Sequence, residues 1–195
     1  MPLTYTNRKK KTYFLCEGVD KSGKSRYFFS REPQGIPLDA KPEGYVIQES
    51  INGVVSLVKQ QPGHLSEQEI AVVTSALAAH PKKNHYRAEA KHKIITVYEP
   101  ETGELQQSEI DPDHISSFLH HLALRRTPDE SRLQFSPIMR FVLVDANLRY
   151  FRAERMRFTG MTRWIHVSGN KTIDKLAPEL IATLGTDQFY ELYRF

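Results

Sequence analysis

Strand-like segments of this sequence come in consecutive pairs, and the members of each pair are joined by a few residues that favour a tight chain reversal. Asn52-Gly53 is the clearest joint, because both residues accept the positive φ of a two-residue hairpin turn. Asp20–Lys24 and Asp145–Asn147 are two further joints. Strands joined in this way lie antiparallel, and the helix-like segments do not alternate with single strands. The pattern predicts an α+β fold with a mainly antiparallel β-sheet, built from hairpins and packed by three to four helices.

The chain has the apolar residues that a core requires. It contains 195 residues, 39% of them hydrophobic, with ten Phe and nine Tyr. This composition excludes a chain that is disordered throughout. The predicted strands cover 12–19, 26–31, 45–49, 54–59, 85–99, 138–144, 149–158 and 161–167.

The residues that predict helices, like those that predict hairpins, lie a few positions apart in the sequence. Ser66 and Glu69 have the spacing of a capping box, Pro112 stands at a favourable first helical position, and Gly185 is typical of a helix end. The predicted helices cover 66–80, 112–124, 172–184 and 186–193.

Three regions follow from these elements. Residues 1–11 are expected to form a basic flexible tail, residues 12–135 an α+β region, and residues 136–195 a β-meander with C-terminal helices. The alternative is that the last two regions form one continuous domain.

Charge is distributed unevenly. Four residues of the tail account for the whole net charge of +4: Arg8, Lys9, Lys10 and Lys11. Residues 138–171 contain seven basic and two acidic side chains, whereas residues 97–135 contain eight acidic side chains and three arginines. The basic region is expected to attract anions, unless the two regions neutralise each other across a contact.

The strand predicted after Asn147 carries the candidate binding site. Strand alternation places Arg149, Phe151, Arg155 and Arg157 on one face, and Arg163 and Trp164 follow on the next strand. Guanidinium groups bind phosphates and aromatic rings stack on bases. The first hypothesis is therefore a non-enzymatic protein whose basic, aromatic sheet face, within residues 138–171, binds an anionic partner, either a nucleic acid or an acidic protein surface. The alternative is a solvated face without a ligand.

A phosphate-loop pattern is the second candidate. Gly18-Val19-Asp20-Lys21-Ser22-Gly23-Lys24-Ser25 matches G-x-x-x-x-G-K-[ST]. This segment resembles the phosphate loop of thymidylate kinases, and Arg31-Glu32-Pro33 resembles their substrate segment. The resemblance implies an ATP–magnesium enzyme in which Gly18, Gly23, Lys24 and Ser25 bind the nucleotide and its metal. A phosphate loop must lead into a helix, however, and residues 26–31 are of aromatic strand type. The sequence favours a hairpin turn.

Other classes of site are less well supported. Cys16 is the only cysteine, so it forms no disulfide within the chain, and the histidines lack compact metal-ligand spacing. No cofactor or metal is therefore expected under the first hypothesis. The chain has no apolar run long enough for a membrane span, and we expect a cytoplasmic protein. A third hypothesis is an assembly protein whose C-terminal residues form a subunit contact: Phe189, Tyr190, Leu192, Tyr193 and Phe195.

Overall fold

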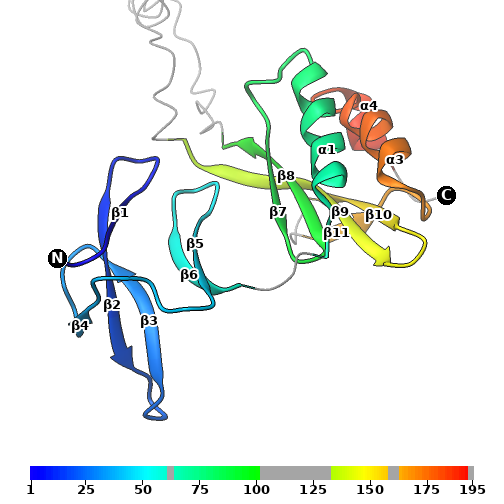
Figure 1. The fold of residues 1–195 in the computed structure, drawn as a ribbon. Coiled ribbons are helices and arrows are strands. Elements are labelled where there is room, and N and C mark those ends of the chain that lie inside the picture. The colour runs from blue at the N-terminus through cyan, green and yellow to red at the C-terminus, as the bar shows by residue number, and fades with distance from the viewer. Residues whose placement is uncertain (61–63, 102–132, 158–162, 193–195) are drawn as a thin grey trace, which may run out of the picture. The chain divides into compact units, whose positions relative to one another are not determined.

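The computed structural model describes residues 1–60, 64–101, 133–157 and 163–192, and its fold is α+β with mainly antiparallel pairing (Figure 1). Its contacts divide the chain into two compact units. The N-terminal unit combines Met1–Gln60 with Glu101–Gln134, and the sheet–helix unit combines Gln61–Pro100 with Phe135–Phe195. The helix predicted over 112–124 lies outside the described residues, as does most of the acidic region.

The N-terminal unit is built from short strands. One sheet has the order β1-β2-β3, with β4 also paired to β2, and a separate two-stranded sheet joins β5 to β6. The strand bounds are β1 Thr4–Thr6, β2 Thr12–Val19, β3 Ser25–Ser30, β4 Ile36–Pro37, β5 Tyr45–Glu49 and β6 Val55–Lys59. The two hairpins predicted in this unit form at the predicted joints, because β2 pairs with β3 and β5 with β6, each antiparallel.

The first eleven residues, expected to be a tail, contain β1, which pairs antiparallel with β2. The turn that follows β1 is organised by Asn7, a side chain only 4% exposed. Its Oδ1 accepts the amides of Lys9 and Lys11 at 3.0 and 2.9 Å, and its Nδ2 donates to the carbonyl of Gly53 at 2.6 Å. The basic residues therefore lie in a turn with defined hydrogen bonds. One of these bonds joins Asn7 to Gly53, which is distant in the sequence.

The sheet–helix unit contains a five-stranded antiparallel sheet in the order β11-β10-β9-β8-β7. Its strands are β7 Arg87–Lys91, β8 Ile94–Pro100, β9 Phe135–Asp145, β10 Tyr150–Arg157 and β11 Arg163–His166. The sequence placed a region boundary near residue 136. The structure differs, because β8 pairs along β9 and so joins residues on both sides of that position in one sheet.

The single strand predicted over 85–99 is instead the hairpin of β7 and β8. Its turn contains His92, whose φ is +54°. A histidine in the left-handed region is uncommon, and no Gly or Asn marks this turn in the sequence. No turn-forming residue in the sequence therefore predicts this chain reversal.

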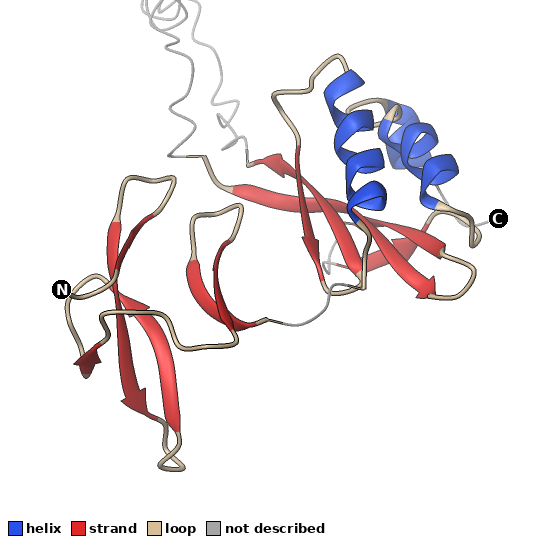
Figure 2. Ribbon diagram, in the orientation of Figure 1, coloured by secondary structure: helices blue, strands red, loops and turns tan. Residues whose placement is uncertain are grey.

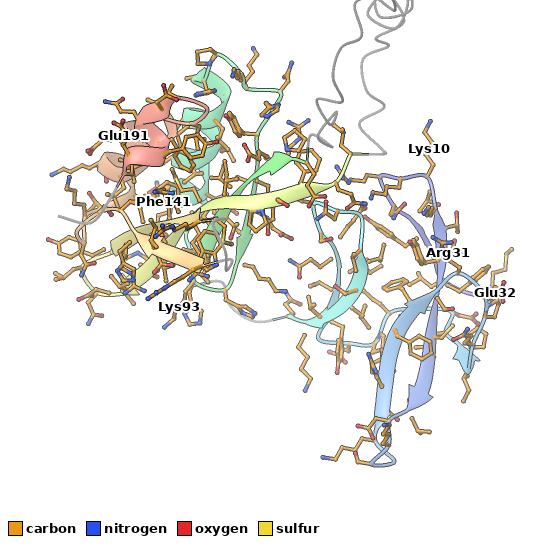
Figure 3. The ribbon with its side chains drawn as sticks, turned by 180° about the vertical axis from the view of Figure 1, so that it is seen from behind. Lys10, Arg31, Glu32, Lys93, Phe141 and Glu191 are labelled. Atoms are coloured by element: carbon orange, nitrogen blue, oxygen red, sulfur yellow. The ribbon has the colours of Figure 1, made fainter. Side chains whose placement is uncertain are left out.

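Three described helices lie on the same side of this sheet: α1 Glu67–Ala79, α3 Ile173–Ile181 and α4 Asp187–Glu191 (Figure 2). Their apolar side chains and those of the covered sheet face form one core, which includes Val73, Leu176, Phe141 and Phe151. Figure 3 labels Phe141 within this unit, with Glu191 of α4 above it and Lys93 of the turn between β7 and β8 below it in this view. We call the side of the sheet opposite the helices the open face.

The predicted capping box of α1 is confirmed. The Ser66 hydroxyl accepts the amide of Glu69 at 3.2 Å, and the Glu69 carboxylate accepts the amide of Ser66 at 2.8 Å. Glu69 is 8% exposed and also accepts from Arg149, with Nε at 2.8 Å from Oε1. Burial raises the pKa of Glu69. The hydrogen bonds from Arg149 and Ser66 lower it by a larger amount, so the pKa of Glu69 in the folded protein lies below its ordinary value.

We expect this pairing to make the sheet–helix unit less stable in acid. A lowered pKa in the folded state stabilises the fold above the unfolded pKa, about 4.3 for Glu. That contribution disappears as the pH falls through the folded pKa. Urea unfolding at several pH values should show this loss in the wild type, while Glu69→Gln should be less stable at neutral pH and lack the step. Glu67→Gln, an exposed neighbour in the same turn, is the control. Identical pH curves for Glu69→Gln and the wild type would contradict the assignment.

Candidate functional site

The face predicted to bind an anion is the face that the helices cover. Strand alternation correctly groups Phe151 and Arg155, but these side chains are only 0% and 4% exposed. Phe151 belongs to the core beneath the helices. The prediction is therefore wrong for these two residues, because alternation shows which residues share a face and not which face is buried.

Arg155 and Arg149 are bound by groups of their own unit. Arg155 donates from Nε to the carbonyl of Leu192 at 3.0 Å and from a terminal nitrogen to the carbonyl of Tyr190 at 2.7 Å, and thereby holds the chain around the end of α4. Arg149 binds Glu69 and donates to the carbonyl of His64 at 3.0 Å. Both guanidinium groups thus stabilise the fold.

The remaining predicted residues lie along β10 and β11. Arg157 and Arg163 are register partners, and both are exposed. Trp164 pairs with Met156, and alternation places it on the open face, away from Phe151 and Arg155. The six predicted residues therefore do not share one face of the sheet. Trp164 lies on the open face and belongs to a different site from the predicted one.

A row of register partners crosses all five strands on the open face. Glu89 pairs with Thr96, Thr96 with Arg140, Arg140 with Glu154, and Glu154 with His166. Each residue of this row lies on a different strand. The spacing of residues within one segment of the sequence therefore could not predict the row.

Glu154 is the centre of this row and is only 2% exposed. Its carboxylate accepts Nε of Arg140 at 2.6 Å and Nε of Arg152 at 3.0 Å. Nε2 of His166 lies 3.2 Å from the same carboxylate. A buried carboxylate requires such partners, and here Arg140 supplies one from the neighbouring strand β9 and Arg152 another from β10 itself.

Arg140 extends this network to an aromatic ring. Its guanidinium carbon lies 4.2 Å from the ring centroid of Trp164, within the range of a cation–π contact. Because Glu154 holds Arg140 on one side, the arginine and the indole stack in a defined geometry. The sequence contained Arg140 in its basic region, but gave no signal that it would contact Trp164.

A pocket of about 450 Å³ opens beside this stack on the sheet–helix unit. Its lining combines two aromatic rings with basic side chains from the turn between β7 and β8. The lining residues are His64, Glu89, Lys91, His92, Lys93, Ile94, Thr96, Tyr98, Pro137, Arg140 and Trp164. We call this site the Trp164 pocket. Lys91, His92 and Lys93 are exposed at its edge, and Figure 3 labels Lys93.

Tyr98 forms the second aromatic wall of the Trp164 pocket. Its hydroxyl donates to Oε2 of Glu89 at 3.1 Å. Burial, together with the charge of Glu89 and this hydrogen bond, raises the pKa of Tyr98 to about 12. The phenol therefore stays neutral at physiological pH, and its hydroxyl engages the carboxylate of the pocket.

The phosphate-loop segment adopts the hairpin that the sequence favoured. Gly18 and Ser25 lie on paired strands, and Gly23, with a φ of +79°, belongs to the turn between them. Asp20 Oδ1 accepts the amides of Ser22 and Lys24 at 2.7 and 3.0 Å. The chain after Lys24 is a strand rather than a helix, and a carboxylate already occupies two turn amides. This geometry differs from that of a phosphate-binding loop.

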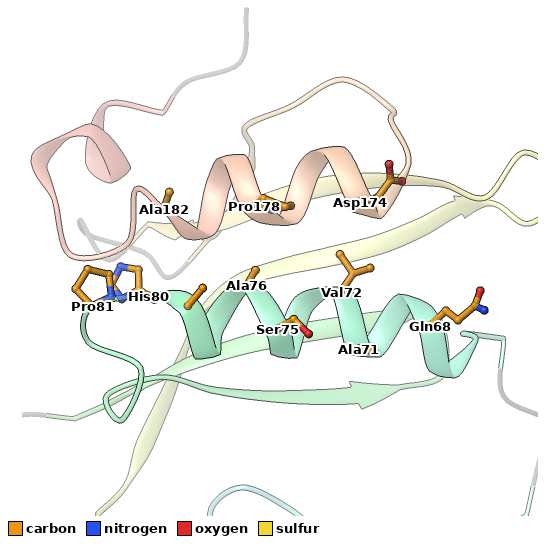
Figure 4. A pocket seen from close by; sticks show the side chains of 11 residues that line it. Gln68, Ala71, Val72, Ser75, Ala76, His80, Pro81, Asp174, Pro178 and Ala182 are labelled. Carbon is orange, nitrogen blue, oxygen red and sulfur yellow. The ribbon is translucent and has the colours of Figure 1, made fainter.

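A second pocket, of about 820 Å³, lies between α1 and α3 (Figure 4). Its lining is Gln68, Ala71, Val72, Ser75, Ala76, Ala79, His80, Pro81, Asp174, Pro178 and Ala182. These residues include no lysine or arginine. An anionic partner is therefore matched by the Trp164 pocket and not by this one.

The described part of the chain offers little support for the other types of site. Within it, no group of three or more His, Cys, Asp or Glu side chains is placed to hold a metal ion. None of the helices in these residues has the length and apolar character needed to span a membrane. Phe189, predicted for a subunit contact, is 4% exposed and packs into the core of its own unit.

No known protein family, curated protein or solved structure matches this chain.

Proposed function

We propose that this protein is a non-enzymatic binding protein, and that the open face of the five-stranded sheet takes an anionic partner, a nucleic acid. The Trp164 pocket is the observation that carries this proposal. Its lining contains three basic side chains, Lys91, Lys93 and Arg140, against a single carboxylate, Glu89, and it adds two histidines. Lysine and arginine contacts to phosphates supply most of the affinity for nucleic acids.

Aromatic rings favour a nucleic acid over an acidic protein surface. Carboxylates would pair with the lysines alone, whereas bases also stack on rings such as those of Trp164 and Tyr98. Binding rather than catalysis is supported by the polar groups of the pocket. Glu89 accepts a hydrogen bond from Tyr98, and Arg140 is held by Glu154. These contacts arrange a surface and engage the groups that would otherwise serve as acid or base.

Salt dependence tests the proposal. The logarithm of the association constant for an oligonucleotide should fall linearly with the logarithm of salt concentration. The double variant Lys91→Ala, Lys93→Ala should weaken binding at low salt. On a single strand it should also make the slope shallower by about 0.7 for each phosphate that a lysine no longer neutralises.

The matched control is Lys171→Ala, Lys175→Ala, two exposed lysines of the same unit at the N-terminal end of α3. This variant should bind like the wild type. Absence of binding to any nucleic acid at low salt would overturn the proposal, as would binding of polyglutamate with equal affinity.

A further inference from the structure

The indole of Trp164 is fixed before any ligand arrives. Glu154, 2% exposed, accepts Nε of Arg140 at 2.6 Å, and the guanidinium carbon of Arg140 lies 4.2 Å from the centroid of the indole. The arginine therefore covers part of the ring while Trp164 also lines the pocket. A ring held in this way loses little conformational entropy when a flat ligand stacks on it.

The pocket has the size and chemistry for one base and its neighbouring phosphates. Its volume of about 450 Å³ lies within the usual range for a site that holds one small organic group. Aromatic walls come from Trp164 and Tyr98, and the exposed lysines Lys91 and Lys93 stand at the edge. Rings therefore line the interior, where a base would lie, and positive charges line the edge, where a charged backbone would pass.

We infer that the Trp164 pocket takes one unpaired base of a single-stranded nucleic acid, stacked on the indole, while Lys91 and Lys93 contact the flanking phosphates. This inference rests on the proposed function and adds the class of nucleic acid. A base in a duplex is already stacked and paired, so it cannot enter without an opening cost. The protein is therefore selective for single strands, with little preference among bases, since every base has a face that can stack.

Intrinsic fluorescence tests the stacking directly, because Trp164 is the only tryptophan of the chain. Three ligands of equal length and charge per strand should be titrated into the full chain: an oligothymidylate, an abasic phosphodiester and a duplex. The oligothymidylate should quench Trp164 and bind about 5-fold to 150-fold more tightly than the abasic strand, the value of one stacked base. The abasic strand should bind without quenching.

Variants separate stacking from charge. Trp164→Ala should reduce the affinity for oligothymidylate to that for the abasic strand and leave the abasic affinity unchanged, as measured by anisotropy of labelled strands. Trp164→Phe should retain much of the base-dependent affinity, which keeps the test decisive if the alanine variant folds poorly. Tyr190→Ala removes an aromatic side chain that is 55% exposed near the C-terminus and should have no effect.

Arg140 acts as a positioning residue for the indole. Arg140→Gln should increase the fast local component of the fluorescence anisotropy decay of Trp164 in the free protein, and it should weaken binding of oligothymidylate more than binding of the abasic strand. An unchanged decay would show that Arg140 does not hold the ring.

The outcomes distinguish this inference from the proposed function. Equal, unquenched binding of all three ligands would overturn base stacking and leave the proposed anion-binding function standing. Preference for the duplex would also overturn the single-strand inference alone. Failure of every ligand to bind at low salt would overturn both.

Discussion

Phe141→Ala should lower the free energy of unfolding of the sheet–helix unit by about 3 to 5 kcal/mol. Phe141 is 0% exposed and pairs with Ile95 on one side and Ala153 on the other, on the sheet face beneath the helices. Removing the ring leaves a cavity among residues of three strands, and such a site cannot collapse around a methyl group. The transfer free energy of the ring and the cavity therefore both contribute.

Urea unfolding followed by the fluorescence of Trp164 measures this effect in the correct unit, since Trp164 belongs to the same sheet. Val144→Ala provides the control, because Val144 lies on the same strand but is 40% exposed. A surface substitution of that kind changes stability by roughly 0.5 kcal/mol. Equal effects of the two substitutions would show that Phe141 is not part of a packed core.

Glu154→Ala should have the second largest effect. It should lower the free energy of unfolding by about 3 kcal/mol, the lower end of the range for breaking a buried ion pair. The carboxylate is 2% exposed, whereas the side chains of Arg140 and Arg152 are 28% and 34% exposed. Without Glu154, two guanidinium groups and His166 face one another with no anion between them. Water reaches the partly exposed arginines, which places the expected loss at the lower end.

A surface ion pair is the comparison for Glu154. Glu179 lies 3.6 Å from Lys171, and their side chains are 63% and 49% exposed. Glu179→Ala should therefore lower the free energy of unfolding by less than about 1 kcal/mol. Removing Arg152 together with Glu154 relieves the repulsion between the guanidinium groups, so the double variant Glu154→Ala, Arg152→Ala should be more stable than Glu154→Ala alone. A double variant that is less stable would contradict this account of the cluster.

The local elements of the fold could be predicted because their signals are chemical and short-range. Gly53 adopts a positive φ in the turn between β5 and β6, whereas Asn52, expected to do the same, does not; the hydroxyl of Ser66 and the carboxylate of Glu69 cap α1. These features depend on residues a few positions apart. The turn at His92 shows the limit, because its left-handed residue is a histidine and not the Gly or Asn by which such a turn is usually predicted.

The candidate site could be predicted only in part. The Trp164 pocket includes part of the sheet region that the sequence singled out, but the sequence also assigned a binding role to Arg155, which is buried. A guanidinium group is buried when carbonyl oxygens satisfy it, and the carbonyls that bind Arg155 belong to Tyr190 and Leu192, more than thirty positions away. The partnership of Arg140 with Trp164 depends on strand register in the same way. Such non-local contacts leave no local pattern.

The two outer strands of the five-stranded sheet carry features that limit pairing with a strand of another molecule. Their outward backbone groups could pair with the strand of another molecule, which is a common route to aggregation. β7 alternates charged residues, Arg87, Glu89 and Lys91, with small alanines, and β11 is only four residues long and starts at Arg163. Short length and charge at an outer strand discourage intermolecular sheet growth. Charge on β7 and the short length of β11 thereby limit the addition of a further strand at either margin of the described sheet.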